Sequence, residues 1–447
     1  MTQMLLALVV VAPLAVAATA VMVQRPLTFT LPAFAASLPA GGLLAVGSSR
    51  FSSLSSILGL LLVAGLLIRL LSGHRMAAPM SLTVPLWLLF LGVAGGTTLW
   101  SLEPSTTAGG FVLLGSLTAI YTLISMSPVD REIIRRTENG LLVGGVVVSC
   151  YGLAQLLFLG GFPANVAGAS LGTGGRFGYD LLGPDNEAVS LLLPLLIAVN
   201  RSVTRAGAWW RWWHAGLAAL VLMGIVMTGS RGGILATLLS SFALALASQQ
   251  GRRRLLAATA LGLGFGAVAF FLHPLGIAER TVQTSSSSGR TAIWRVGLAA
   301  CPRYCPLGSG WETFPIVYAQ TQPSVADAQV LVGQGGSYQP HNVILLVAIE
   351  LGIPGLILLF AALGATLADA FRVPARVRGP PLAALLGTLF AAMFLSNLEY
   401  KFFWMALVMV ALSRNLARCE AARTTSGAST TRPLAGSRRT SSGTPGP

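Results

Sequence analysis

Runs of apolar residues long enough to cross a bilayer recur along most of the chain, and they constrain its fold more than any other feature. A membrane-spanning helix needs roughly 20 consecutive apolar residues. The 447 residues are 54% hydrophobic and only 10% charged, with a mean hydropathy of +0.74. A soluble protein carries about 25% charged residues. The sequence therefore predicts an all-α integral membrane protein.

The apolar runs fill residues 1–416, where we expect one polytopic membrane domain. Candidate spans are 4–23, 29–47, 53–72, 82–101, 108–127, 139–160, 187–200, 214–228, 232–248, 255–273, 341–363, 380–398 and 402–416. The second is interrupted by Pro32, Pro39 and Gly41, so we interpret it as broken or re-entrant. About 12 transmembrane helices are expected, 12 or 13 in all. Residues 417–447 are rich in Ser, Thr, Gly, Pro and Arg, which predicts a disordered basic tail.

The net charge of +15 comes mostly from arginines in short loops, and such loops stay on the cytoplasmic side. The basic loops contain Arg131, Arg135 and Arg136; Arg201, Arg205 and Arg211; Arg252 to Arg254; and Arg372, Arg376 and Arg378. Alternation then places residues 161–186, 229–233 and 276–340 on the extracytoplasmic side, with the tail inside. The N-terminus is inside for 12 spans and outside for 13. No basic face is interleaved with aromatic residues outside the membrane, so we expect no nucleic-acid partner.

The four cysteines and four histidines do not predict a metal site or a cofactor, because they are scattered and lack zinc-binding spacing. Cys301 and Cys305 would close a small disulfide loop if their segment is extracytoplasmic. The sequence alone leaves that pairing open.

Arginines on the extracytoplasmic side break the cytoplasmic bias and need another explanation. Arg231 lies in Gly229-Ser230-Arg231-Gly232-Gly233, between two apolar runs. A guanidinium always carries its charge and binds phosphate in a bidentate manner, the glycines allow a headgroup to approach the backbone, and Ser230 adds a donor. The alternative is that Arg231 only marks the membrane boundary.

Arg290 opens a segment, residues 290–296, that has the pattern of an amphipathic helix lying along the outer leaflet. Arg290 is a candidate anion ligand, Arg295 a headgroup contact and Trp294 a sugar or acceptor contact. Each arginine is equally well explained as a solvated loop residue.

His341 and Asn342 stand where the long polar loop returns to the membrane. An imidazole titrates near neutrality and is suited to general acid–base catalysis, and Asn342 would orient it or bind sugar. The alternative is an interfacial polar tip. In the other long outer loop, Arg176 precedes Gly-Pro-Asp-Asn-Glu-Ala. Arg176 is a third candidate phosphate or sugar contact, and either Asp185 or Asn186 would cap the next helix.

Five sequence segments, in this order, resemble the O-antigen ligase and O-antigen polymerase family of bacterial cell-envelope glycosyltransferases. They are R…P-D-N-E-A at 176–188, T-G-S-R-G-G-I-L at 228–235, S-G-R-T-A-I-W at 288–294, P-L-G-S-G-W-E-T-F at 306–314 and H-N-V-I-L-L-V-A-I-E-L-G-I-P-G at 341–355. The chain departs from the family in Gly-Pro-Asp-Asn, where members more often have an Asn-Pro-Asn-like turn. This leaves the roles of Asp185 and Asn186 open.

The resemblance implies an inverting, metal-independent membrane glycosyltransferase of the GT-C type in the bacterial inner membrane. Its donor would be a glycan on undecaprenyl diphosphate, and its acceptor a hydroxyl group of a glycan or glycolipid on the extracytoplasmic face. Arg231 and Arg290 would bind the donor diphosphate, with Arg176, Arg295 and Ser230 as further contacts. Asn186 joins Asn342 and Trp294 as a candidate sugar or acceptor ligand, and His341 would assist the acceptor.

The alternative function is a multi-span transporter or flippase for lipid-linked sugars. Transporters often contain two related halves, which this sequence lacks. No motif distinguishes a ligase from a polymerase or indicates an oligomeric state.

Overall fold

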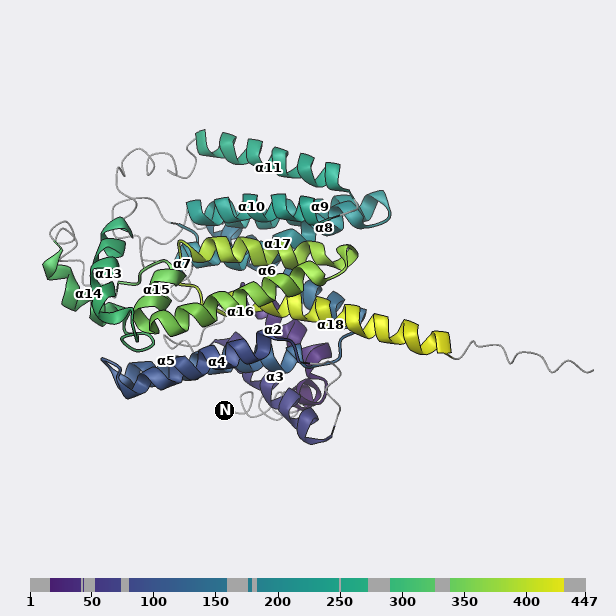
Figure 1. Ribbon diagram of the computed structural model, residues 1–447. Coiled ribbons are helices and arrows are strands. Elements are labelled where there is room, and N and C mark those ends of the chain that lie inside the picture. Colours follow the sequence, from purple (N-terminus) through teal and green to yellow (C-terminus); the bar gives the residue numbers. More distant parts are fainter. Residues whose placement is uncertain are drawn as a thin grey trace, which may run out of the picture.

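The computed structural model describes residues 17–41, 43, 53–73, 80–158, 176–178, 183–248, 251–271, 290–325 and 338–429. Within these residues the chain forms helices and no strand. Figure 1 shows the long helices packed side by side, with the short helices α13, α14 and α15 gathered at one end. The predicted all-α fold is confirmed.

The helices before the long polar loop account for most of the predicted spans. They are η1 (Pro26–Thr30), α2 (Leu31–Ser37), α3 (Leu54–Leu71), α4 (Thr83–Gly96), η2 (Thr97–Leu99), α5 (Pro104–Ser125), α6 (Arg131–Phe158), α7 (Gly183–Ser190), α8 (Leu192–Thr204), α9 (Ala208–Met227), α10 (Arg231–Ala247) and α11 (Arg252–Phe271). The polar loop and the remaining chain form α13 (Arg290–Tyr304), α14 (Phe314–Thr321), η3 (Gln322–Ser324), α15 (Val343–Glu350), α16 (Gly352–Arg372), α17 (Ala375–Ala392) and α18 (Lys401–Ser429).

Seven helices in the described part of the chain are long and apolar enough to cross a membrane, and residues 83–99 and 231–247 form two shorter apolar helices. This supports a multi-pass membrane protein but does not confirm the predicted 12 or 13 spans. Large apolar side chains face outward: Leu60 is 70% exposed and Val112 is 59% exposed. Lipid is the environment in which such surfaces are stable.

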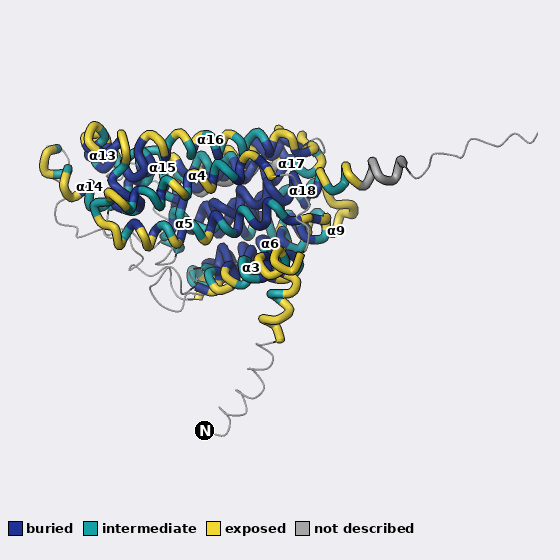
Figure 2. Tube along the Cα trace, turned by 60° about the horizontal axis from the view of Figure 1, so that its bottom comes forward, coloured by how far each residue is buried: buried dark blue, intermediate teal, exposed yellow. Residues whose placement is uncertain are grey.

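Helix α18 lies in the centre of the bundle, because 83% of its most apolar stretch is buried, compared with 33% for α3 and for α16. Figure 2 shows the buried residues concentrated in the interior of the bundle, with exposed ones along α13 and the outer side of α16. The ring of Trp404 packs on Trp87, with centroids 4.8 Å apart, and on Tyr121 at 6.2 Å. These contacts join α18 to α4 and α5.

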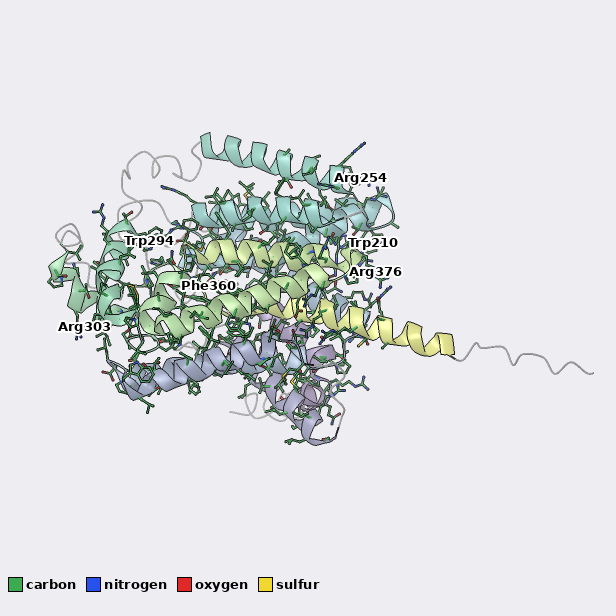
Figure 3. The ribbon with its side chains drawn as sticks, viewed as in Figure 1. Trp210, Arg254, Trp294, Arg303, Phe360 and Arg376 are labelled. Atoms are coloured by element: carbon green, nitrogen blue, oxygen red, sulfur yellow. A yellow bond between two sulfur atoms is a disulfide. The ribbon has the colours of Figure 1, made fainter. Side chains whose placement is uncertain are left out.

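Polar side chains join the helices at the end of the bundle opposite α13. Arg414 donates to the Asp369 carboxylate at 2.8 Å and to the Ser125 carbonyl at 3.1 Å. Arg131 and Arg376 both pair with Glu420. Figure 3 shows Trp210, Arg254 and Arg376 at this end, and Trp294 and Arg303 at the other. The basic loops thus gather at one end, as expected for cytoplasmic loops.

Two predicted boundaries differ from the structure. The interrupted second span contains the short helix α2, which packs directly against α6: a Cβ atom on Gly140 would lie 2.2 Å from the Pro32 carbonyl oxygen. Helix α18 continues to Ser429, so residues 417–429 of the predicted disordered tail are helical. The helix of the last predicted span continues without a break into the tail, which composition alone did not indicate. Residues 430–447 lie outside the described residues, as do residues 4–16 of the first predicted span, 4–23.

Candidate active site

The segment Pro-Leu-Gly-Ser-Gly-Trp anchors the outer helices to the bundle. Gly308 and Gly310 have φ angles of 88° and 112°, a conformation that side chains disfavour. This conformation lets Ser309 donate its backbone N–H to the Ile349 carbonyl at 2.9 Å and accept from the Leu102 N–H at 2.9 Å. The motif therefore joins the end of α13 to α15 and to the turn before α5.

Two further contacts fix this anchor. Trp311 is fully buried and lies edge-on to Phe90, with centroids 6.3 Å apart. The buried carboxylate of Glu350 accepts hydrogen bonds from the backbone N–H groups of Glu312 and Phe314, each at 2.9 Å. Glu350 thus satisfies backbone donors between α13 and α14 that would otherwise be buried without an acceptor.

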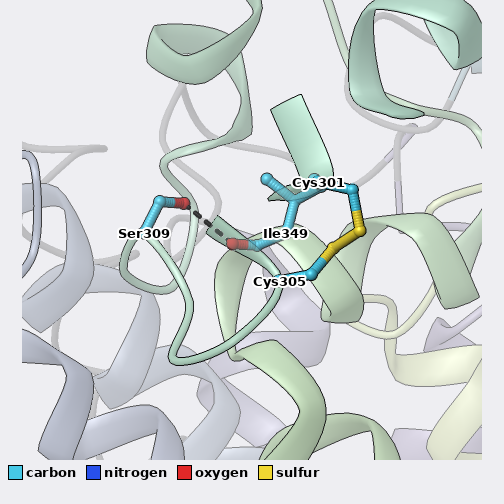
Figure 4. Close-up of a disulfide and its surroundings, with 4 residues drawn as sticks. All are labelled: Cys301, Cys305, Ser309 and Ile349. Atoms are coloured by element: carbon cyan, nitrogen blue, oxygen red, sulfur yellow. Dashed lines mark hydrogen bonds between the residues drawn. A yellow bond between two sulfur atoms is a disulfide. The ribbon is translucent and has the colours of Figure 1, made fainter. Parts of the chain in front are cut away.

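A disulfide joins Cys301 to Cys305 at the end of α13, with the Cα atoms 4.7 Å apart. Figure 4 shows it beside Ile349, whose carbonyl oxygen also accepts the Ser309 hydroxyl at 3.1 Å. The disulfide that the sequence left open is therefore present in the structure. It ties the last turn of α13 to the start of the anchoring segment.

Helix α13 begins at Arg290, as the sequence predicted, and so carries this arginine at its first position. One turn later, the indole N–H of Trp294 donates to the Pro340 carbonyl at 2.7 Å. Pro340 is the residue before His341. This hydrogen bond holds the end of the polar loop against α13, so Arg290 and His341 belong to one local structure.

Asp185 is the junction of the site. Its Oδ1 accepts from Arg176 Nη2 at 2.7 Å and its Oδ2 accepts from Arg290 Nη2 at 3.0 Å. The two arginines are therefore brought together although 114 residues separate them in the sequence. The buried Ser230 hydroxyl lies close enough to the Asp185 carboxylate to act on its charge. Sequence reasoning favoured helix capping for Asp185 or Asn186 and missed this ion-pair role.

The Ser-Arg-Gly-Gly turn lies directly beside this junction. Arg176 Nε donates to the Thr228 carbonyl at 2.9 Å. Ser230 caps α10 by accepting the Gly233 N–H at 3.1 Å. Its hydroxyl therefore has a structural role in addition to its predicted role as a donor to the headgroup. A Cβ atom on Gly233 would lie 2.4 Å from the Ala188 Cβ, so α7 packs tightly against the start of α10.

Arg231 is the first residue of α10, and its side chain is exposed. In the described part of the chain its guanidinium has no ion pair and no hydrogen bond. Its sequence neighbour Ser230 acts on the Asp185 carboxylate, and Arg176 donates to the carbonyl of nearby Thr228, so Arg231 begins its helix at the edge of the cluster. Arg295, the fifth position from Arg290, is exposed on α13.

His341 follows Pro340, which Trp294 holds against α13. The charges of both Arg290 and Asp185 act on its imidazole. Loss of hydration and then the positive charge of Arg290 lower the pKa of His341 to about 4, and Asp185 acts in the opposite direction. The side chain is therefore neutral at pH 7. His341 also has a φ angle of 47°, a conformation that costs of order 1–3 kcal/mol in a residue other than glycine and is found most often at functional sites.

The structure gives Asn342 a structural role beside its predicted role as a sugar or acceptor ligand, which stays a prediction. Its Oδ1 accepts the backbone N–H groups of Ile344 and Leu345 at 2.9 and 3.0 Å, which caps α15. Its Nδ2 donates to the Met393 carbonyl at 3.2 Å. Asn-before-apolar-run is a common capping pattern, and that signal was available in the sequence. Asn186 lies in the first turn of α7 beside Asp185.

Fold and site together define a multi-pass helical membrane protein with a cluster of arginines, one aspartate and one histidine at one end of its bundle. Residues 216–360 match the model of the O-antigen ligase family. This match covers about a third of the chain. It supports the family resemblance that the sequence motifs indicated and a role in membrane glycan processing of the O-antigen ligase or polymerase type. The matched residues include Arg231, Arg290 and His341 but neither Arg176 nor Asp185. A search of curated proteins found no match to the chain.

Proposed function

We propose that this protein is a metal-independent inverting glycosyltransferase with a GT-C-like fold. It transfers a glycan from an undecaprenyl-diphosphate-linked donor to an acceptor hydroxyl on the extracytoplasmic face of the bacterial inner membrane. The observation that carries this proposal is the convergence of Arg176, Arg290 and His341 around Asp185, at the end of the bundle opposite the basic loops. A cationic cluster with a neutral imidazole fits an anionic donor and a hydroxyl acceptor.

In the proposed reaction, the acceptor oxygen attacks the anomeric carbon of the donor sugar. The bond from that carbon to the diphosphate oxygen breaks, and its electron pair leaves with the diphosphate. The proton of the acceptor hydroxyl passes to the neutral imidazole of His341. The diphosphate is already a good leaving group, so the protein needs mainly to position the donor and to stabilise the growing negative charge.

Fixed arginines supply that stabilisation, because preorganised charges act most strongly where water is partly excluded. Arg290 and Arg176 bind the diphosphate from one side. Arg231, which has no partner in the described part of the chain, binds it at the start of α10. Ser230 and Arg295 contribute at the edge, and Trp294 lies close enough to His341 to contact a sugar.

The disulfide supports an extracytoplasmic location for the site, because disulfides persist in oxidising compartments. The basic residues at the opposite end support a cytoplasmic C-terminus. A bacterial cell-envelope enzyme with this orientation would meet lipid-linked glycans after their translocation across the inner membrane.

Reconstitution tests the proposal. The full-length protein is placed in liposomes with a defined undecaprenyl-diphosphate oligosaccharide and candidate acceptors, and products are separated by mass, with and without EDTA. We expect transfer that continues in EDTA. Joined repeat units would identify a polymerase, and a glycan on lipid A–core would identify a ligase. Movement of the lipid-linked sugar between leaflets without any new glycosidic bond would contradict the proposal and favour the transporter.

A further inference from the structure

We propose that Asp185 is a positioning residue that holds Arg176 and Arg290 side by side as one binding unit for the donor diphosphate. This inference rests on the proposed glycosyl transfer. It concerns a residue that lies outside the region matched by the O-antigen ligase family model, and it assigns to Asp185 a function in donor binding rather than in the chemical step.

The geometry of the carboxylate carries the inference. Its two oxygens are divided between two arginines, at 2.7 Å to Arg176 and 3.0 Å to Arg290. Two guanidinium groups that share one carboxylate repel each other, since both always carry a positive charge. A carboxylate between them removes the repulsion. Without it, the two long side chains would separate and lose a common orientation.

Asp185 is itself held by a rigid backbone. It lies in the first turn of α7, where Pro184 is buried and Ala188 is fully buried. The tight contact between Ala188 and Gly233 fixes α7 against the start of α10. Because the aspartate side chain is short, the packing of α7 against α10 sets the position of its carboxylate. The carboxylate in turn holds the two flexible arginine side chains.

Among the contacts of the described residues, both arginines keep N–H groups that can bind a ligand. Arg176 uses Nε for the Thr228 carbonyl and Nη2 for Asp185, and Arg290 uses Nη2 for Asp185. A guanidinium has five N–H donors, so within the described contacts each can bind a phosphate oxygen without leaving Asp185. The ion-paired trio carries one net positive charge, and Arg231 adds a second at its edge. In a clamp, the two arginines bind the diphosphate while they stay paired with Asp185. In the alternative, the Asp185 carboxylate is a placeholder that the donor displaces. The remaining N–H donors and the net positive charge favour the clamp.

Three variants of the full-length protein test the inference: Asp185→Asn, Asp185→Ala and Asp185→Glu. Asparagine keeps the shape but directs an amide N–H at one arginine, whereas glutamate keeps the charge. We expect the asparagine and alanine variants to raise the donor KM about tenfold or more and to change kcat and the acceptor KM less than threefold. The glutamate variant should recover part of the donor affinity. Asp130→Asn is the matched control, because Asp130 caps α6 through the Ile133 N–H and is remote from the arginines.

Binding of inorganic pyrophosphate, measured by calorimetry on the detergent-purified protein, separates this inference from the proposed function. Weaker pyrophosphate binding in Asp185→Asn than in the wild type supports the clamp even if no glycan transfer is found. Equal binding in the two proteins overturns it, and tighter binding in Asp185→Asn identifies a displaced placeholder and also overturns it. The unfolding temperature of each variant is measured as a control. A value equal to that of the wild type excludes a general loss of structure, and Asp185→Glu is the variant that should disturb folding least.

Discussion

The indole N–H of Trp294 donates a 2.7 Å hydrogen bond to the carbonyl oxygen of Pro340. This contact crosses the whole polar loop and sets the distance between the helix that carries Arg290 and the segment that carries His341. It is a neutral hydrogen bond, worth about 1 kcal/mol, yet it positions two groups that act on the same substrate in the proposed reaction.

Trp294→Phe removes this hydrogen bond and keeps the aromatic bulk. We expect kcat to fall roughly fivefold to tenfold, as expected for about 1 kcal/mol of lost positioning. The donor KM should change little, because Arg290 and Asp185 stay in place. Steady-state kinetics on reconstituted protein measure both. An unchanged kcat would show that the loop holds its place by other contacts.

The protonation of His341 gives a second prediction. Its pKa is lowered to about 4 by loss of hydration and by Arg290, whereas the unfolded chain has a value near 6.5. The unfolded chain therefore binds more protons between about pH 4 and 6.5, so stability from this group rises with pH across that window and is lost as the pH falls toward 4. In the pH profile of kcat/KM, the inflection that reports the imidazole of His341 in the free enzyme should lie near pH 4.

NMR of isotope-labelled histidine measures that titration directly, because the chain has only four histidines. Comparison with His341→Gln identifies the signal. A midpoint close to 6.5 in the ligand-free protein would mean that His341 is hydrated and remote from Arg290.

The arginines give a third prediction. Arg290→Ala and Arg231→Ala should each reduce turnover by roughly 10²-fold, by analogy with the loss of one preorganised donor at a transition state. Arg290→Lys should recover only part of the activity, since lysine lacks the bidentate geometry. The measurement is product formation per inserted protein. Arg303→Ala is the control, because Arg303 is exposed on the same helix and stacks on Tyr304 away from the cluster. Near-normal turnover in both alanine variants would remove these residues from the mechanism.

Glu350 should be essential for stability rather than for chemistry. Glu350→Ala leaves the N–H groups of Glu312 and Phe314 buried without an acceptor, at a cost of about 1–3 kcal/mol for each. Glu350→Gln keeps one acceptor oxygen and should lose less. Thermal unfolding of the purified protein ranks the wild type first, then Gln, then Ala. Equal unfolding temperatures with lost activity would instead point to a chemical role.

The disulfide gives a fifth prediction, which thiol labelling tests. Cys150 and Cys419 are free, whereas Cys301 and Cys305 are joined. Alkylation of denatured protein without reductant should add two labels, and reduction should raise this to four. The free energy of unfolding of the Cys301→Ala, Cys305→Ala double variant should be lower by about 2 kcal/mol, the value expected for so short a closed loop. Four labels before reduction would contradict the pairing.

The sequence predicted the features that depend on local pattern. Apolar run length located α3, α5 and α9, and the amphipathic pattern after Arg290 predicted α13. Motif order indicated the family and connected Arg231, Arg290 and His341. Each of these rests on neighbours within a few residues or on a fixed order along the chain.

The remainder depends on contacts between distant residues. The pairing of Asp185 with Arg290 joins positions 105 residues apart, and no local pattern encodes it. Asn342 illustrates a second kind of difference, since a side chain expected to meet substrate also accepts hydrogen bonds from the backbone of its own helix. The number of spans was uncertain because short helices such as α10, with 17 residues, have the composition of a span but less than the usual length.

The anchor made by Gly308 and Gly310 affects how loss-of-function variants in this protein should be interpreted. Side chains at these positions would collide with the Glu350 carbonyl and with Ser101, and the displacement would reach Arg290 through the whole length of α13. A random-mutagenesis screen should therefore recover inactive variants at these glycines as readily as at Arg290. Such a screen would recover variants that disturb the anchoring segment together with variants of the arginines. Only a measurement of protein folding would distinguish these two kinds of variant.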